Sequence, residues 1–160
     1  MSDVLAVTSM RDYFRDAVDA ALARQAVTRD EATSAYLVDL LCEYARQQQD
    51  LFVRPLTWIF ATADSGPPVV LFEHLKQVGD HSLYVAGYFN DSLPRLQLDL
   101  EYFVELGGTA YRRLSRVLRA PLGETRLVAV FSELGHKFLQ FVHVLDEVRR
   151  LADCPVPSSC

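Results

Sequence analysis

Hydrophobic residues recur along most of this chain at the three- and four-residue spacing of amphipathic helices. The spacing predicts long helices over 10–25, 28–49, 69–89, 96–118 and 124–152, and a short helix from Pro55 through Phe60. No stretch shows the alternation of period two that is typical of a half-buried strand. We therefore expect an all-α fold, a helical bundle of five to six helices.

The C-terminal segment 124–152 carries the most regular hydrophobic pattern. Its apolar positions follow one another in steps of four and three: Leu127, Phe131, Leu134, Phe138, Phe141, Leu145, Val148 and Ala152. Such a heptad seam is typical of helices that pack in bundles. We expect one continuous helix here, placed centrally. Short connections join the last three long helices, which predicts that they run antiparallel.

Capping and helix-breaking residues divide the chain. Thr8 or Ser9 is expected to cap the first helix, and Thr28 and Glu31 form a capping box for the second. Gly66 and the prolines after it end the less regular region before residue 69. We predict a flexible N-terminus (1–9), one helical domain (10–152) and a flexible tail (153–160). The domain comprises an N-terminal helical hairpin (10–49) and a three-helix core (69–152).

Small residues in two of the predicted helices indicate a close crossing. Gly107 and Gly108 lie in the middle of 96–118, where each glycine costs about 1 kcal/mol relative to alanine. Close packing usually offsets such a cost. The preceding helix also offers small residues, namely Gly79, Ala86 and Gly87, so we expect the two helices to cross there. Gly79-Asp80 is expected to bend that helix without ending it.

The charge balance argues against binding to nucleic acid. The 160 residues include 16 Lys and Arg against 21 Asp and Glu, a net charge of −5, whereas duplex binding requires a basic stripe. The nearest candidate is a short row that could hold one anionic partner: Arg112, Arg113, Arg116 and Arg119. No secretory signal and no apolar run long enough for a membrane span are visible. The expected location is cytoplasmic, with Cys42 a buried apolar residue.

A metal site is the first chemical possibility that the motifs raise. Glu133 and His136 match the E-x-x-H pattern of di-iron bundles, and His143 and Glu147 extend it. The heptad phase places these residues, with Gln140, opposite the hydrophobic seam. No second copy of the motif is present. We therefore predict a solvated face or a subunit contact, and no metal. Phosphate-binding glycine motifs are also missing, so no cofactor is expected.

A polar row beside the hydrophobic stripe of 69–89 is the candidate pocket. It would lie between helices 69–89 and 96–118 and comprise His74, His81, Tyr84, Tyr88, Glu101, Glu105 and Tyr111. A histidine with a carboxylate partner can act as a base, a ligand or a switch. The alternative is a set of buried polar groups that satisfy one another's hydrogen bonds.

Two functional hypotheses follow. The first is a small, non-catalytic domain for protein–protein interaction or regulation, self-association as a homodimer included. It rests on the absence of catalytic spacing and on the wide apolar helical faces. Exposed aromatic side chains at Trp58, Phe60 and Phe72 would add a partner surface, although we favour a role in capping the end of the bundle. The alternative hypothesis is a small-molecule or cofactor binder that uses the candidate pocket.

Overall fold

The computed structural model describes residues 2–26, 30–46 and 68–152. Over those residues the chain is helical and has no strand, which confirms the predicted all-α bundle. The elements in chain order are α1 (Ser2–Gln25), α2 (Glu31–Arg46), α4 (Pro68–Tyr88), the 3-10 helix η3 (Asn90–Ser92), α5 (Leu100–Leu122), α6 (Arg126–His136) and α7 (Phe138–Ala152). Among the described helices, none combines the length and the apolar character that crossing a bilayer requires.

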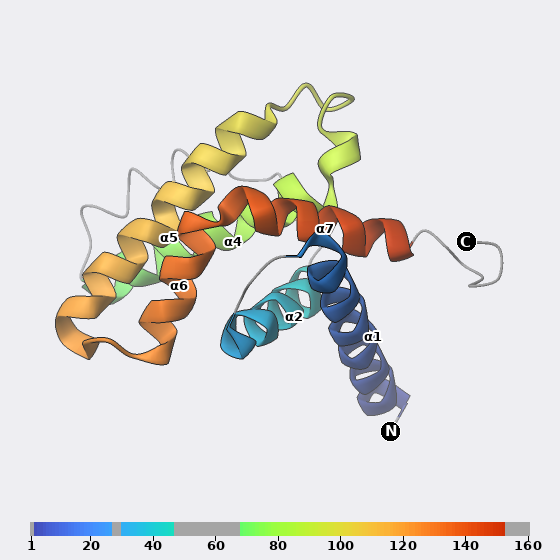
Figure 1. The fold of residues 1–160 in the computed structure, drawn as a ribbon, viewed down its shortest axis with the longest axis horizontal. Helices are drawn as coiled ribbons and strands as arrows, with labels where there is room; N and C mark the ends of the chain where they lie inside the picture. Colours follow the sequence, from blue (N-terminus) through green and yellow to red (C-terminus); the bar gives the residue numbers. More distant parts are fainter. Residues whose placement is uncertain (1, 27–29, 47–67, 153–160) are drawn as a thin grey trace.

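The helices pack as a hairpin and a larger group that share α7 (Figure 1). The helices α1 and α2 lie against each other, as the sequence predicts for the hairpin. In the larger group α4 packs along α5, and α6 packs along α5 as well. The last helix, α7, crosses the molecule to contact both α4 and α1. This crossing joins the hairpin to the other helices.

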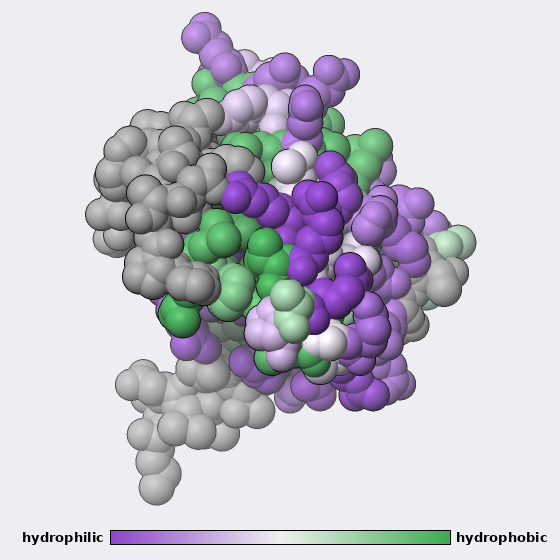
Figure 2. All heavy atoms as spheres, turned by 90° about the vertical axis from the view of Figure 1, so that its left-hand side faces the viewer, coloured by the Kyte–Doolittle hydropathy of each residue, from purple (hydrophilic) through white to green (hydrophobic). Residues whose placement is uncertain are grey.

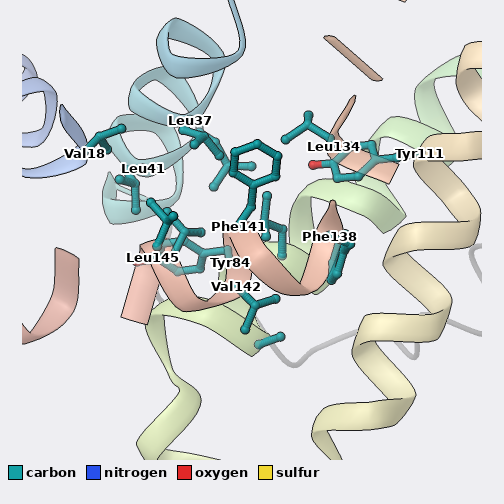
Figure 3. Packing of buried hydrophobic residues seen from close by; sticks show 14 of the residues in the cluster. Val18, Leu37, Leu41, Tyr84, Tyr111, Leu134, Phe138, Phe141, Val142 and Leu145 are labelled. Atoms are coloured by element: carbon teal, nitrogen blue, oxygen red, sulfur yellow. The ribbon is translucent and has the colours of Figure 1, made fainter. Parts of the chain in front are cut away.

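One hydrophobic core runs through the six α-helices of the described residues. Around α7 it includes Phe141 and Leu145, which are fully buried, with Val18 of α1 and Leu37 of α2 close to them (Figure 3). The seam predicted for 124–152 is buried at every described position from Phe131 to Val148. Leu127 is the exception, because 46% of it is exposed. The heptad pattern thus identifies the core face correctly except at its first position.

The continuous C-terminal helix predicted over 124–152 is wrong. The helix breaks at Lys137, whose backbone angles (φ −112°, ψ 27°) are not helical, and α6 and α7 lie on either side. The amide of Lys137 still donates to Glu133 O, and the amide of Phe141 donates to Lys137 O. Because backbone bonds continue through the bend, a change of direction costs little here. The bend lets α6 follow α5 while α7 turns toward α4 and α1.

Helix boundaries differ from the prediction at three other places. The first helix begins at Ser2, so Thr8 and Ser9 lie inside it and residues 2–9, expected outside, are helical. In α2 the cap is Asp30, whose Oδ1 accepts from the amide of Ala32. Thr28 of the predicted capping box lies outside the described residues. The helix predicted from residue 96 begins at Leu100, capped by Asp99.

Of the remaining predictions on helix continuity and connections, some are confirmed and others concern residues outside the described ranges. The helix over 69–89 is continuous, as α4, and Gly123 ends α5 with a positive φ of 71°. The short helix predicted from Pro55 through Phe60, Trp58 and the tail 153–160 lie outside the described residues. Phe72 is described and is half-buried.

The predicted close crossing of α4 and α5 is confirmed at two glycines. A Cβ built on Gly107 would lie 2.7 Å from Ser82 Cβ of α4 and 2.4 Å from Phe138 Cζ of α7. A Cβ built on Gly79 would lie 2.5 Å from a ring carbon of Tyr111 on α5. Gly87, expected at the same crossing, lies against Leu145 of α7.

Candidate functional site

The predicted polar row separates into two groups, and the first is an aromatic cluster between α4 and α2. Tyr84 is buried and stacks on Tyr88, with ring centroids 5.3 Å apart. Tyr44 of α2 lies 5.1 Å from Tyr84 and meets the ring of His81 edge-on at 6.3 Å. Burial lowers the pKa of His81. The rings fill the space between the helices, which favours a structural role for this group.

Tyr111 of the predicted row belongs to the second group, which is centred on a buried carboxylate that the sequence analysis did not name as a site residue. Asp80 of α4 is 5% exposed, and its Oδ1 accepts from the Tyr36 hydroxyl at 2.5 Å and the Tyr111 hydroxyl at 2.6 Å. Its Oδ2 accepts from Lys76 Nζ at 2.8 Å. Burial, together with the neighbouring carboxylate, raises the pKa of Tyr36 and of Tyr111. These contacts join α2, α4 and α5 through one acceptor, a structural hydrogen-bond network of the kind that burial demands.

The other members of the predicted row lie elsewhere. Glu101 and Glu105 are exposed on α5, away from buried Tyr111. His74 is half-buried on α4, and its Nδ1 has no hydrogen-bond partner among the described residues. The structure therefore brings His81, Tyr84 and Tyr88 together and leaves the glutamates apart from them. A role for the row in ligand binding stays a prediction.

The face predicted to be solvated is exposed in part. His136, Gln140 and His143 are exposed, as the heptad phase predicts. Glu147, in contrast, is 8% exposed, because Arg24 of α1 packs beside it with Nε 3.2 Å from Oε1. Glu133 is half-buried and accepts from the backbone amide of Asp30 at 3.1 Å. The expectation of a solvated face is therefore wrong at these two acidic residues, which tie α7 to α1 and α6 to α2.

A basic hollow lies between α5 and α6, and it is the candidate functional site. Its volume is about 390 Å³, and it is lined by Arg112, Ser115, Arg116, Arg119, Ser132 and His136. The α5 residues recur at helical spacing, which places them on one face. Ser132 and His136 are four residues apart on α6 and form the other wall. No lining residue is acidic, so the arginines give the hollow a positive charge, while the Ser115 hydroxyl already donates to Arg112 O at 2.8 Å.

The close approach of two helices positions the walls of this hollow. A Cβ built on Gly135 of α6 would lie 2.8 Å from the backbone nitrogen of Arg112. The Arg112 side chain crosses this contact, because Nη1 donates to Gly135 O at 3.0 Å and Nη2 donates to Thr109 Oγ1 at 3.2 Å. The helices touch at Gly135, and the hollow opens along α5 toward Arg119.

The contacts of the remaining donors leave capacity for a ligand. Arg119 Nε lies 2.5 Å from Glu124 Oε1, an exposed pair. Arg116 is exposed and forms no ion pair with a described carboxylate. Nδ1 of His136 lies 2.7 Å from Ser132 O, which as a carbonyl can only accept. Nδ1 therefore carries the proton, and Nε2 is an acceptor in the neutral ring and a donor only in the imidazolium form.

A second hollow provides a contrast within the same molecule. It lies between α1 and α2, has a volume of about 490 Å³ and is lined by Arg11, Asp39, Cys42, Glu43 and Arg46. Its two cations are matched by two carboxylates, and Arg11 is paired with Asp39. Such a site has no preference for either sign of charge. The hollow between α5 and α6 differs because its arginines face no lining carboxylate.

An apolar cleft lies on the opposite flank of α5 and α6. It has a volume of about 210 Å³ and is lined by Tyr36, Phe72, Leu114, Leu118, Leu127 and Phe131, with Glu73 and Lys76 beside them. Figure 2 shows a hydrophobic patch next to strongly hydrophilic residues on the side of the molecule where α5 ends and α6 begins. Leu127 is exposed because it lines this cleft rather than the core.

Sequence reasoning identified part of the basic hollow. The sequence indicates that the row Arg112, Arg113, Arg116 and Arg119 could hold one anionic partner, and all of these except Arg113 line the hollow. The sequence pattern raises His136 only as a metal ligand and does not indicate Ser132. The described residues contain no group of histidines, cysteines and carboxylates that could hold a metal ion. Comparisons with models of protein families, with curated proteins and with solved structures find no match for this chain.

Proposed function

We propose that this protein is a binding domain that holds a phosphate-type anion in the basic hollow between α5 and α6. The observation that carries the proposal is a hollow of about 390 Å³ with three arginines, two serines and a histidine and no lining carboxylate. Guanidinium groups match phosphate oxygens in a fixed, two-pronged geometry and keep their charge at every physiological pH.

The charge of the whole chain strengthens the argument. The net charge of −5 means that the average surface repels anions. A concentrated positive site on such a surface therefore supports a specific role in anion binding. Arg116, with no described carboxylate partner, is the centre of the site. Arg112 is oriented by its bonds to Gly135 O and Thr109 Oγ1, which reduces the entropy lost on binding.

Calorimetric titration with inorganic phosphate and with pyrophosphate, at constant ionic strength, tests the proposal. We expect at least one of the two to bind. Arg116→Ala should weaken that binding about tenfold or more, since a charge-assisted hydrogen bond contributes about 1.5–3 kcal/mol. Arg15→Ala, which removes an exposed arginine from α1, is the matched control and should leave the affinity unchanged. The proposal is wrong if neither anion binds or if the two variants behave alike.

A substitution at Glu124 is expected to strengthen anion binding, which provides a second test. Glu124 pairs with Arg119 at the edge of the hollow, so it competes with any anion there. Glu124→Gln should therefore tighten anion binding several-fold, which a variant that merely damages the fold would not do. Unchanged or weaker binding in Glu124→Gln would contradict a site that includes Arg119.

The apolar cleft favours a second candidate function, docking of a protein partner. We propose that the partner inserts one large apolar side chain and places a basic residue against Glu73. The charge of Lys76 is already balanced by Asp80, whereas Glu73 has no described cation partner. Peptides selected by display on this protein, with counter-selection on Leu127→Asp, should share an apolar–basic motif. Selection of no such motif would exclude this partner. The cytoplasmic location and the homodimer stay predictions.

A further inference from the structure

Building on the proposed function, we infer that the ligand of the basic hollow carries two phosphoryl groups, as a diphosphate or a bisphosphate does. The inference rests on how the arginines are distributed along α5. Arg112, Arg116 and Arg119 are separated by four and three residues. At a rise of 1.5 Å per residue the row therefore extends about 10 Å along the helix axis.

The two ends of this row have different contacts within the protein. At one end Arg112 is held by Gly135 O and Thr109 Oγ1. At the other end Nε of Arg119 forms an exposed ion pair with Glu124 Oε1. Because the row extends about 10 Å, we expect a single phosphate near Arg116 to contact one neighbouring guanidinium and not both. Two linked phosphoryl groups can contact Arg112 and Arg116 with one group, and Arg116 and Arg119 with the other.

The α6 wall of the hollow also carries polar residues one helical turn apart. Ser132 and His136 are four residues apart on α6, about 6 Å along its axis. Because Gly135 faces Arg112, His136 lies toward the Arg112 end and Ser132 toward the middle of the row. The polar side chains of both walls thus lie along the length of the hollow rather than in one ring around a point. Its volume of about 390 Å³ lies within the range of small-molecule sites, about 300–1,000 Å³.

Titration with three anions at constant ionic strength tests the inference. Pyrophosphate should bind at least about 30-fold more tightly than inorganic phosphate. Citrate, which carries a similar charge on carboxylates, should bind no better than phosphate. In Arg119→Ala the advantage of pyrophosphate over phosphate should fall below about threefold, because only one phosphoryl group is then held. Circular dichroism of each variant establishes that it is folded, and Arg15→Ala serves as the control.

The outcomes separate this inference from the proposed function. If pyrophosphate and phosphate bind with affinities within threefold of each other, a two-phosphoryl ligand is excluded and the anion site stands. If citrate binds as tightly as pyrophosphate, the hollow responds to charge alone and the inference fails. If Arg119→Ala keeps the full preference for pyrophosphate, Arg119 does not help to bind the second phosphoryl group, and the inference fails. If none of the three anions binds, the proposed function fails with the inference.

Discussion

Two adjacent glycines in α5 provide a direct test of how the helices pack. In an exposed helix, glycine to alanine stabilises by about 1 kcal/mol. A Cβ on Gly107 would lie 2.4 Å and 2.6 Å from two ring carbons of Phe138 and 2.7 Å from Ser82 Cβ. A Cβ on Gly108 would have Arg112 Nη1 as its nearest neighbour, at 3.0 Å. The same substitution should therefore have opposite effects at the two positions.

The expected magnitudes follow from what surrounds each site. Phe138 is 3% exposed and packs against the Tyr111 ring, with centroids 6.0 Å apart, so it has little room to move. Overpacking of this kind costs about 1–3 kcal/mol. After the helix-propensity gain, Gly107→Ala should destabilise by up to about 2 kcal/mol, and Gly107→Leu by more. At Gly108 the nearest atom is Arg112 Nη1, which donates to Gly135 O and needs to shift by only a few tenths of an ångström, so Gly108→Ala should be neutral or stabilise by up to about 1 kcal/mol.

Urea unfolding followed by circular dichroism at 222 nm measures both variants on the same scale. We expect Gly108→Ala to unfold at a higher urea concentration than Gly107→Ala, with a difference of about 1–3 kcal/mol between them. Equal stabilisation by the two substitutions would show that Phe138 does not pack on α5 at Gly107. The close crossing of α4, α5 and α7 would then be wrong.

Three further predictions concern the titratable groups. Asp80→Ala should destabilise by about 2–5 kcal/mol in urea unfolding, since two tyrosine hydroxyls lose their acceptor, and a loss under 1 kcal/mol would contradict the network. The raised pKa values of Tyr36 and Tyr111 keep both protonated in the folded state above pH 10, where the unfolded chain loses those protons. The contribution of the two tyrosines to the free energy of unfolding should therefore be fully present below about pH 10. Above that pH the free energy of unfolding should fall by about 1.4 kcal/mol per pH unit for each tyrosine. The double variant Tyr36→Phe, Tyr111→Phe should show a smaller slope. The lowered pKa of His81 has the opposite consequence, a loss of stability as pH falls below about 6.5, and an equal acid dependence in His81→Gln would refute it.

The helices could be predicted from the sequence because the hydrophobic spacing is a local property. Phe131, Leu134, Phe138 and Phe141 share one side of a helix in any arrangement, and they are all buried. The break at Lys137 leaves that spacing intact, so nothing in the pattern indicates it. It arises because α6 and α7 have different neighbours, which only the three-dimensional arrangement determines.

The polar centre at Asp80 was not predicted for a related reason. Within α4 the residue reads as part of a possible bend after Gly79, with Lys76 four residues before it as an ordinary helix pair. Its two tyrosine donors come from α2 and α5, 44 and 31 residues away in the chain. Tyr111 was expected beside histidines and glutamates. The one available signal was an acidic residue in a helix with a long apolar stripe, which requires a partner when buried.

The break at Lys137 and the basic hollow have a common structural basis. Because α6 ends its course along α5 with Gly135 against the backbone of Arg112, the side chains next to Gly135 on α6 face α5. His136, which the heptad phase assigns to solvent, then becomes part of a wall opposite arginines while remaining exposed. If α6 continued along its own axis beyond His136, the chain would not follow the direction of α7. The contacts of α7 with α1 and α4 would then be lost. The chain therefore satisfies both packing requirements by turning after His136, while Ser132 and His136, which precede the turn, line the hollow opposite the arginines of α5.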